Sequence, residues 1–369
     1  MELTEGEYAV AGLDGVRTPA LLIYADRVDR NITATLRLLD GPNRWRPHLK
    51  TAKLGWTMER LHAAGVTQAK CATALELEAA CGAGFEDVLL AYPASGPSVE
   101  LIRAIAEAHP HTRVSALVED AAMVTAWQGS RVGLFIDLNP GMNRTGALPD
   151  PEQLLAIAKH IGGLGLEWRG LHYYDGHASG AAVLAGYDDL LQLADEIRRS
   201  GLAVPEIVTA GTSAFPAALG YHGLSDAGYL HRLSPGTLVY GDVRSLDELP
   251  ADAGYTAAAL VLTRVVSHPC PTRITCDAGH KTVSADAGDP TCAVLGHADW
   301  TPRHPSEEHL PIDLPADAPL PARGTPLWLL PRHVCPTVNN FDHALIISGK
   351  SIQQIEPVTA RGRHVPLSA

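Results

Sequence analysis

The chain has 369 residues, of which 46% are hydrophobic and 19% charged, a composition typical of globular proteins. This length exceeds one typical hydrophobic core, so a large domain with a smaller one is expected. The formal net charge of -12 argues against nucleic acid or an anionic membrane as a partner, because both are bound through surface cations.

Cysteine usage and the N-terminal sequence indicate the cellular compartment. The six cysteines are scattered without a CxxC pair, so neither a disulfide framework nor a zinc ribbon is predicted. The N-terminus lacks a basic region followed by an apolar one, and no run of about 18 apolar residues occurs. We therefore expect a cytoplasmic protein with no membrane-spanning segment.

From residue 18, short apolar runs alternate with amphipathic stretches, which is typical of βα units around a parallel sheet. Eight such strands predict a TIM (β/α)8 barrel, and a doubly wound sheet is the alternative. A further run at Gly236–Tyr240 could be a ninth strand, in which case either it or the first strand belongs elsewhere. The predicted barrel strands are Ala20–Tyr24, Trp45–Lys50, Gln68–Ala72, Asp87–Tyr92, Arg113–Val118, Val132–Leu138, Glu167–Tyr174 and Pro205–Ala210.

After Asp242 the pattern changes to strand-like runs separated by loops rich in proline and glycine, without helical periodicity. This pattern predicts a mainly antiparallel β domain. We predict an N-terminal segment at residues 1–17 packed on the β domain, a barrel at 18–245 and a C-terminal β domain with a metal site at 246–369.

The segment from Arg46 to Lys53 concentrates three cations and a histidine in an otherwise acidic chain. Read as a strand, it places Arg46, His48 and Lys50 on one face. A lysine at the mouth of a barrel can have a lowered pKa and act as a Schiff-base amine. The alternative interpretation is a solvated basic loop.

Polar residues also follow the later predicted strands. Arg144 lies in the turn after the sixth strand, and the stretch from His172 to His177 ends the seventh. The eighth is followed by Gly211 and Thr212, in a loop of small residues whose backbone N–H groups could bind phosphate. Taken alone, such a loop is usually just a turn.

In the β domain, His333 and Cys335 are two residues apart, and on a strand they would point the same way. Imidazole and thiolate can bind one metal ion, for which ligand softness favours Zn²⁺. Two protein ligands leave positions open for water or substrate, as in a catalytic site. The alternative is a buried cysteine near an incidental histidine.

The motifs fall in the order RPHLKTAK, LNPGMNRTG, GLHYYDGH, TAGTSAFP, SPGTLVYGD, DAGHKTVSAD and PRHVCPTVNNFDHALII. Together they resemble the D-threonine aldolase and D-serine dehydratase family of fold-type III pyridoxal phosphate (PLP) enzymes, relatives of alanine racemase. The resemblance covers nearly the whole chain. It implies a PLP-binding barrel, a β domain, a homodimer and a divalent metal beside the cofactor, either Zn²⁺ or Mn²⁺.

The resemblance also implies roles for individual residues. Lys50 would form the Schiff base with PLP. The family motif commonly carries a second histidine where this chain has Ala52, so any role of that histidine in substrate binding or proton transfer is either lost or moved to another histidine. The remaining implied roles are Arg144 near the phenolic oxygen of the ring, Gly211, Thr212 and Tyr240 at the phosphate, Tyr174 lining the pocket, His333 and Cys335 at the metal, and His48, His172 or His177 as the replacement for the missing histidine.

Two reactions of β-hydroxy-D-amino acids fit this family. Dehydration gives a 2-oxo acid and ammonia, and retro-aldol cleavage gives glycine and an aldehyde. Dehydrating members usually have His-x-Cys at the metal and the aldolases often have His-x-Asp, so Cys335 favours a dehydratase acting on D-serine or 3-hydroxy-D-aspartate. A racemase would leave His333 and Cys335 unexplained, and a non-catalytic PLP-binding protein resembles an isolated barrel.

Overall fold

The computed structural model describes residues 4–366, and its contacts divide the chain into two compact units. Unit 1 contains the chain up to Thr35, Thr51–Thr57 and Thr237–Arg361. Unit 2 contains Leu36–Lys50, Met58–Gly236 and the residues from Gly362 on. The predicted domain boundaries at 17/18 and 245/246 stay a prediction. Within residues 4–366, no helix is both long and apolar enough to cross a membrane.

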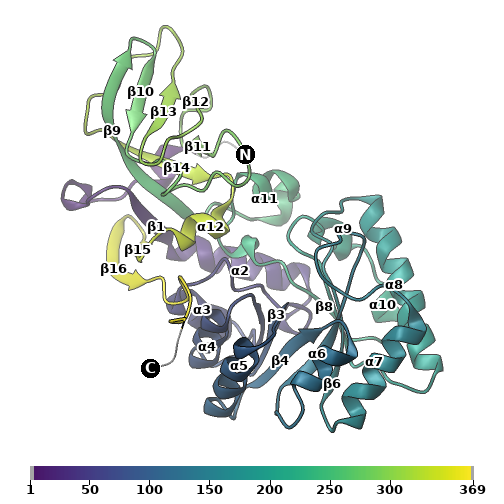
Figure 1. Cartoon of the computed structure of the whole chain (residues 1–369). Helices are drawn as coiled ribbons and strands as arrows, with labels where there is room; N and C mark the ends of the chain where they lie inside the picture. Colours follow the sequence, from purple (N-terminus) through teal and green to yellow (C-terminus); the bar gives the residue numbers. More distant parts are fainter. Residues whose placement is uncertain (1–3, 367–369) are drawn as a thin grey trace. The chain divides into compact units, whose positions relative to one another are not determined.

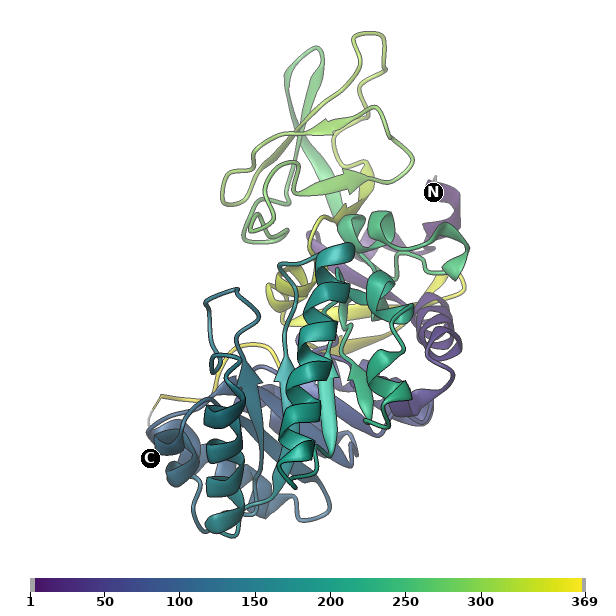
Figure 2. The same cartoon turned by 90° about the vertical axis from the view of Figure 1, so that its right-hand side faces the viewer.

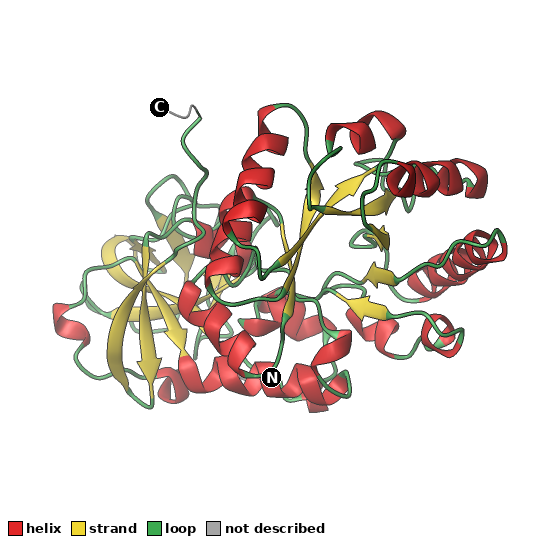
Figure 3. Cartoon of the chain, turned by 90° about the horizontal axis from the view of Figure 1, so that it is seen from below, coloured by secondary structure: helices red, strands yellow, loops and turns green. Residues whose placement is uncertain are grey.

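Unit 2 is built on a seven-stranded parallel sheet whose spatial order, β2 to β8, follows the chain. Figure 1 labels β3, β4, β6 and β8 of this sheet. Helices connect successive strands and lie around them in Figure 3, and Figure 2 shows the long α8 running along the sheet. The strands are β2 (Gln68–Cys71), β3 (Asp87–Pro93), β4 (Arg113–Val118), β5 (Gly133–Leu138), β6 (Trp168–Tyr173), β7 (Glu206–Thr209) and β8 (His231–Leu233). The helices are α4 (Ala74–Gly82), α5 (Pro97–Ala108), α6 (Ala121–Ala126), α7 (Pro151–Gly163), α8 (Ala181–Arg199), α9 (Phe215–Leu219) and α10 (Gly223–Asp226).

Residues 45–49, here called the closing segment, lie between the two edge strands of this sheet. Trp45 bridges to Leu233 of β8, and His48 bridges to Lys70 of β2, both in parallel orientation. The Leu49 N–H donates to the Lys70 carbonyl at 2.7 Å. The segment therefore takes the eighth position and closes the ring, which confirms the predicted TIM barrel.

Three details of the strand prediction are wrong. Ala20–Tyr24 is β1 of unit 1, where it pairs with β15 (His343–Ser348) and β9 (Ala259–Cys270). Gly236–Tyr240 is not a strand, because Thr237–Val239 forms a 3-10 helix. The strand β8 was not predicted, since three residues are too few to show a hydrophobic period.

Unit 1 contains a nine-stranded sheet in which β1 and β15 pair in parallel and the other described pairs are antiparallel. The prediction of a mainly antiparallel β domain is thus confirmed, but the expected lack of helices is wrong. The remaining strands are β10 (Arg273–Cys276), β11 (Cys292–Val294), β12 (Thr301–Pro302), β13 (Leu310–Asp313), β14 (Pro326–Pro331) and β16 (Ser351–Pro357). The α-helices of unit 1 are α1 (Glu5–Tyr8), most of α2 (Ala25–Leu38), α11 (Val243–Glu248) and α12 (Val334–Asn339), whereas most of α3 (Gly55–Ala63) belongs to unit 2.

Arg46 does not belong to a cationic face shared with Lys50. Its side chain is fully buried and donates to Glu206 at 2.8 Å and 3.0 Å and to Asp87 at 2.9 Å. Asp87 and Glu206 are the first residues of β3 and β7, so these ion pairs lie at the amino-terminal end of the barrel. Arg46 therefore has a structural role at the end opposite to the one that carries function in such barrels.

Candidate active site

Lys50 directly follows the closing segment, at the carboxyl-terminal end of the barrel. Its backbone N–H donates to Nδ1 of His48 at 3.3 Å, so the imidazole of His48 is turned back onto its own chain. Gly236 lies so close that a Cβ there would be 2.2 Å from the His48 carbonyl oxygen. Gly236, the glycine of the SPGT motif, therefore allows the closing segment to pack directly against the SPGT loop. This contact helps to fix the backbone position of Lys50.

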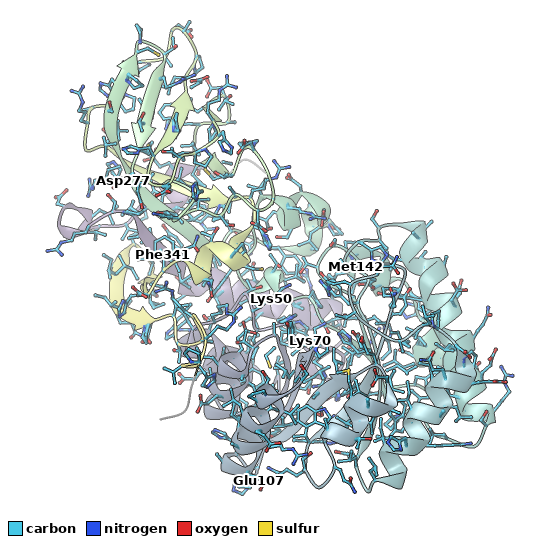
Figure 4. All side chains as sticks on the ribbon, in the orientation of Figure 1. Lys50, Lys70, Glu107, Met142, Asp277 and Phe341 are labelled. Carbon is cyan, nitrogen blue, oxygen red and sulfur yellow. The ribbon has the colours of Figure 1, made fainter. Side chains whose placement is uncertain are left out.

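A second lysine, Lys70 of β2, lies in the same region and was missed by the sequence analysis. Figure 4 labels it close to Lys50. Its side chain is buried, and its Nζ is 3.4 Å from Nε2 of His172 on β6. Burial, and next the charge of Lys50, lower the pKa of Lys70 to about 7. A lysine within a four-residue strand gives no sequence signal that distinguishes a buried amine from an exposed one.

His172 connects Lys70 to Asp137 of β5. Nδ1 of His172 is 2.7 Å from one carboxylate oxygen of Asp137, and the Thr145 hydroxyl donates to the other at 2.8 Å. Burial and the charge of Lys70 lower the pKa of His172, and hydrogen bonding to His172 keeps the pKa of Asp137 low despite its burial. The neutral imidazole thus donates its Nδ1–H to Asp137 and turns the Nε2 lone pair toward Lys70.

Tyr174 and Arg144 lie together in the same unit. The Arg144 guanidinium carbon is 4.7 Å from the Tyr174 ring centroid, and Lys70 Nζ is 5.8 Å from that centroid. A Cβ at Gly211 would be 3.1 Å from the Tyr174 ring, so the tyrosine also lies against the loop after β7. The structure thus brings together three of the residues predicted from different strand ends.

The backbone N–H groups of the loop after β7 were predicted to be available to phosphate, but two of them already have an acceptor. The Gly211 N–H donates to Asp175 at 3.0 Å, and the Ala210 N–H donates to the same carboxylate at 3.3 Å. Among the described residues, the buried hydroxyl of Ser234 has no hydrogen-bond partner, although the Ser234 N–H donates to the carbonyls of Thr209 and Ala210. Ser234 directly follows β8, so an unpartnered buried hydroxyl lies beside the loop after β7.

The structure also gives the positions of His177, Tyr240 and Thr212. His177 is exposed on the loop after β6. Tyr240 belongs to unit 1, where its hydroxyl is 2.7 Å from the Thr57 hydroxyl. Thr212 is half-buried on the loop after β7.

His333 and Cys335 come together, although not on a strand as predicted. His333 is the N-cap residue of α12 and Cys335 lies in its first turn, so a helix start replaces the expected strand geometry. Burial lowers the pKa of His333, but a hydrogen bond and charge interaction with Cys335, and then those with Asp286, outweigh burial and raise it to about 9. The Cys335 sulfur is also 2.9 Å from the Thr51 hydroxyl.

Asp286 was not predicted, and it holds the other side of the imidazole. Its carboxylate is 2.6 Å from Nδ1 of His333 and accepts from the Ser284 hydroxyl at 2.8 Å. The Ser284 N–H donates to the Thr337 hydroxyl at 3.2 Å, and this hydroxyl donates to the His333 carbonyl at 2.9 Å. The resulting ring of hydrogen bonds fixes the imidazole orientation, so Nε2 is the ring nitrogen through which His333 could bind a metal.

This donor set suits a divalent cation. Among the described residues, no group of three or more His, Cys, Asp or Glu side chains forms a metal cage. A site of two protein ligands, imidazole nitrogen and thiolate sulfur, keeps open positions, which is the arrangement of catalytic metal sites.

Comparisons with known proteins identify the family. The sequence model of the alanine racemase N-terminal domain matches residues 23–244, and that of a putative serine dehydratase domain matches residues 258–347. The chain belongs to the alanine racemase N-terminal domain family, and its relatives include proteins named as an aldolase and as a dehydratase.

Three relatives span nearly the whole chain. D-threonine aldolase of an Arthrobacter species is 27% identical, over 94% of this chain and 93% of its own. D-threo-3-hydroxyaspartate dehydratase of a Delftia species is 26% identical, over 88% of this chain and 92% of its own. The crystal structure of D-threonine aldolase from Filomicrobium marinum aligns with a TM-score of 0.84 at 27% identity, covering 94% of this chain and 96% of that one.

Proposed function

We propose that the protein is a PLP- and metal-dependent lyase acting on β-hydroxy-D-amino acids, and that it dehydrates them to a 2-oxo acid and ammonia. The observation that carries the proposal is the position of Lys50, at the carboxyl-terminal end of the closing segment with Lys70, Arg144 and Tyr174 in the same unit. Full-length similarity to an aldolase and a dehydratase of such amino acids supports the substrate class.

The residues of the barrel fit PLP. Lys50 would hold the cofactor covalently, Arg144 would lie near its phenolic oxygen, and Tyr174 would line its pocket. Thr212 and Ser234 would bind its phosphate with their hydroxyls, together with Tyr240. The Gly211 N–H would have to give up its hydrogen bond to Asp175 in order to bind the phosphate. Gly211 would therefore contribute less to phosphate binding than the motif suggests. When bound, PLP supplies an electron sink for negative charge at the substrate Cα.

In unit 1, His333 and Cys335 would hold a divalent metal, which supplies Lewis-acid help at the β-hydroxyl. Zn²⁺ is favoured by the thiolate, and Mn²⁺ is the alternative. Removing the metal with excess EDTA should abolish turnover while PLP stays bound, as measured by its visible absorbance. Full activity in EDTA would contradict the role of the metal.

Individual residues of the chain would have separate roles in the reaction. The Lys50 amine would take the proton from Cα. His48 could act only through Nε2, because its Nδ1 accepts the Lys50 N–H. His177 could reach a substrate only from its exposed loop. Cys335 supports dehydration, because the dehydrating members of the family usually have His-x-Cys at the metal.

Retro-aldol cleavage to glycine and an aldehyde is the second candidate, since the Arthrobacter and Filomicrobium relatives are D-threonine aldolases. One experiment separates the two reactions. The holoenzyme is incubated with D-serine, D-threonine, 3-hydroxy-D-aspartate and D-phenylserine, with the L-isomers as controls, and products are quantified. We expect 2-oxo acid with ammonia from the D-isomers. If the products are glycine and an aldehyde, the reaction is retro-aldol cleavage and not dehydration. If neither pair of products is formed, the proposed function is refuted.

A further inference from the structure

The proposed function leaves a buried lysine of the barrel unexplained. Lys70 is 2% exposed, so it does not serve to solubilise the surface. Its backbone is paired with the closing segment on both sides, because the Lys70 N–H donates to the Pro47 carbonyl at 2.9 Å and the Lys70 carbonyl accepts from Leu49 at 2.7 Å. The backbone of Lys70 is thereby held next to the segment that carries Lys50.

The Lys70 amine ends a continuous chain of polar contacts through the barrel. Nζ lies 3.4 Å from His172 Nε2, His172 Nδ1 lies 2.7 Å from Asp137, and Thr145 donates to Asp137 at 2.8 Å. Each side chain comes from a different strand or from the loop after one, and Lys70, His172 and Asp137 are all at least 95% buried. Such a chain holds one proton in a defined place and excludes competing water.

The charges that face Lys70 come from several elements. Lys50 and Arg46 disfavour a proton on its amine, whereas Asp137 and Asp175 favour one. His172 offers a lone pair from β6, and the Tyr174 ring lies 5.8 Å away. Burial is the largest effect and lowers the pKa of Lys70 to about 7. A lysine with such a pKa can both accept and return a proton near neutral pH.

We propose that Lys70, His172 and Asp137 form a buried proton relay that ends beside Lys50 and exchanges protons with it during the reaction. The inference rests on the proposed function. The neutral Lys50 amine takes a proton from the substrate Cα, and the resulting ammonium transfers one proton to Lys70. Lys70 keeps this proton and donates a hydrogen bond to His172 Nε2, Asp137 stabilises the added charge through His172, and the proton returns to Lys50 at the end of the reaction. One proton moves between two amines, and no electrons are transferred.

The test replaces Lys70 and follows the pH profile of kcat for the holoenzyme on the D-amino acid that it turns over. Lys70→Met removes the amine at similar length, and Lys70→Arg keeps a charge that cannot be lost. The exposed Lys159 of α7 gives a matched control, Lys159→Met, which should behave as wild type. We expect wild-type kcat to rise with pH through about 7, as the Lys70 ammonium gives up its proton.

Both Lys70 variants should retain PLP absorbance, lose about 10²-fold or more in kcat, and lose this rise with pH. A PLP-bound Lys70→Met variant with wild-type kcat and profile would overturn the relay. If Lys70→Met does not bind PLP, His172→Gln decides: a displaced rise supports the relay, and an unchanged profile overturns it. Lack of turnover by the wild type refutes the proposed function itself, whereas turnover that is insensitive to Lys70 refutes only the relay.

Discussion

Ala52 is the residue at which this chain departs from the common motif of its relatives, and its side chain is buried in unit 1. An alanine cannot transfer a proton, so other groups must supply any acid or base that the missing histidine provides. Of the three histidines considered as replacements, His48 is turned onto its own backbone and His177 is exposed. His172 is hydrogen-bonded to the buried carboxylate of Asp137, and this favours it as the replacement.

Asp286 gives a prediction at the same scale. Because its carboxylate holds Nδ1 of His333 at 2.6 Å, it orients the imidazole and fixes the tautomer that presents Nε2 to a metal. Asp286→Asn should weaken Zn²⁺ binding about 10- to 100-fold, measured by competition with a chromogenic chelator.

The control for this experiment is a second acid–histidine pair in the same unit. The Asp289 carboxylate lies 2.8 Å from Nδ1 of the exposed His304, which is not a proposed ligand, so Asp289→Asn should leave metal affinity unchanged. Equal affinities of wild type and Asp286→Asn would show that the carboxylate does not position the ligand. If His333→Ala also bound Zn²⁺ normally, the metal would lie elsewhere.

At the scale of elements, the closing segment determines the position of Lys50. It makes only isolated bridges to β2 and β8, partly because Pro47 has no N–H to donate. Because a continuous ladder of strand hydrogen bonds is lacking, close packing must hold the segment in place. The Trp45 indole donates to the Pro235 carbonyl at 2.9 Å, and Gly236 fits against His48.

Gly236→Ala tests this packing. The new Cβ would lie 2.2 Å from the His48 carbonyl oxygen, so the closing segment or the SPGT loop must move. We expect a loss of about 1–3 kcal/mol in the free energy of unfolding, measured by urea denaturation, together with weaker PLP binding by absorbance titration.

Gly220→Ala is the matched control for Gly236→Ala. The nearest atom to a Cβ at Gly220 is 3.8 Å away, and its backbone is in the ordinary helical region. The control should keep wild-type stability and cofactor affinity. A Gly236→Ala variant that matches it in both measurements would show that the closing segment tolerates displacement.

The same elements show what can be predicted from the sequence. The alternation of apolar runs and helices correctly indicates β2 to β7, because each strand is long enough and is followed by a helix. Ala20–Tyr24 has the same composition as a barrel strand, but only its long-range pairing with β9 and β15 determines its sheet.

The site was predictable to the extent that chemistry is visible in short motifs. Lys50, Arg144 and Tyr174 stand at ends of predicted strands, where barrels carry function. Lys70 and Asp286 do not stand at strand ends. Lys70 lies within a strand and contacts His172, whereas Asp286 lies in a long loop and contacts His333, and both contacts are tertiary. Sequence spacing alone cannot reveal such contacts.

For the whole molecule, the two family matches at residues 23–244 and 258–347 account for most of the chain, and the full-length relatives have both parts. The proposed function accordingly uses residues of both units, a lysine of the barrel and a histidine–cysteine pair of the β domain. The central claim is that Lys50 is the amine that carries PLP.

The most direct test is to reduce the PLP-loaded enzyme with borohydride, digest it and locate the pyridoxyl group by mass spectrometry. The chain has only six lysines, so the assignment is unambiguous. We predict that the group is found on Lys50, and that Lys50→Ala carries none and has no lyase activity. A pyridoxyl group on Lys70 or another lysine, or none on any, would contradict the account.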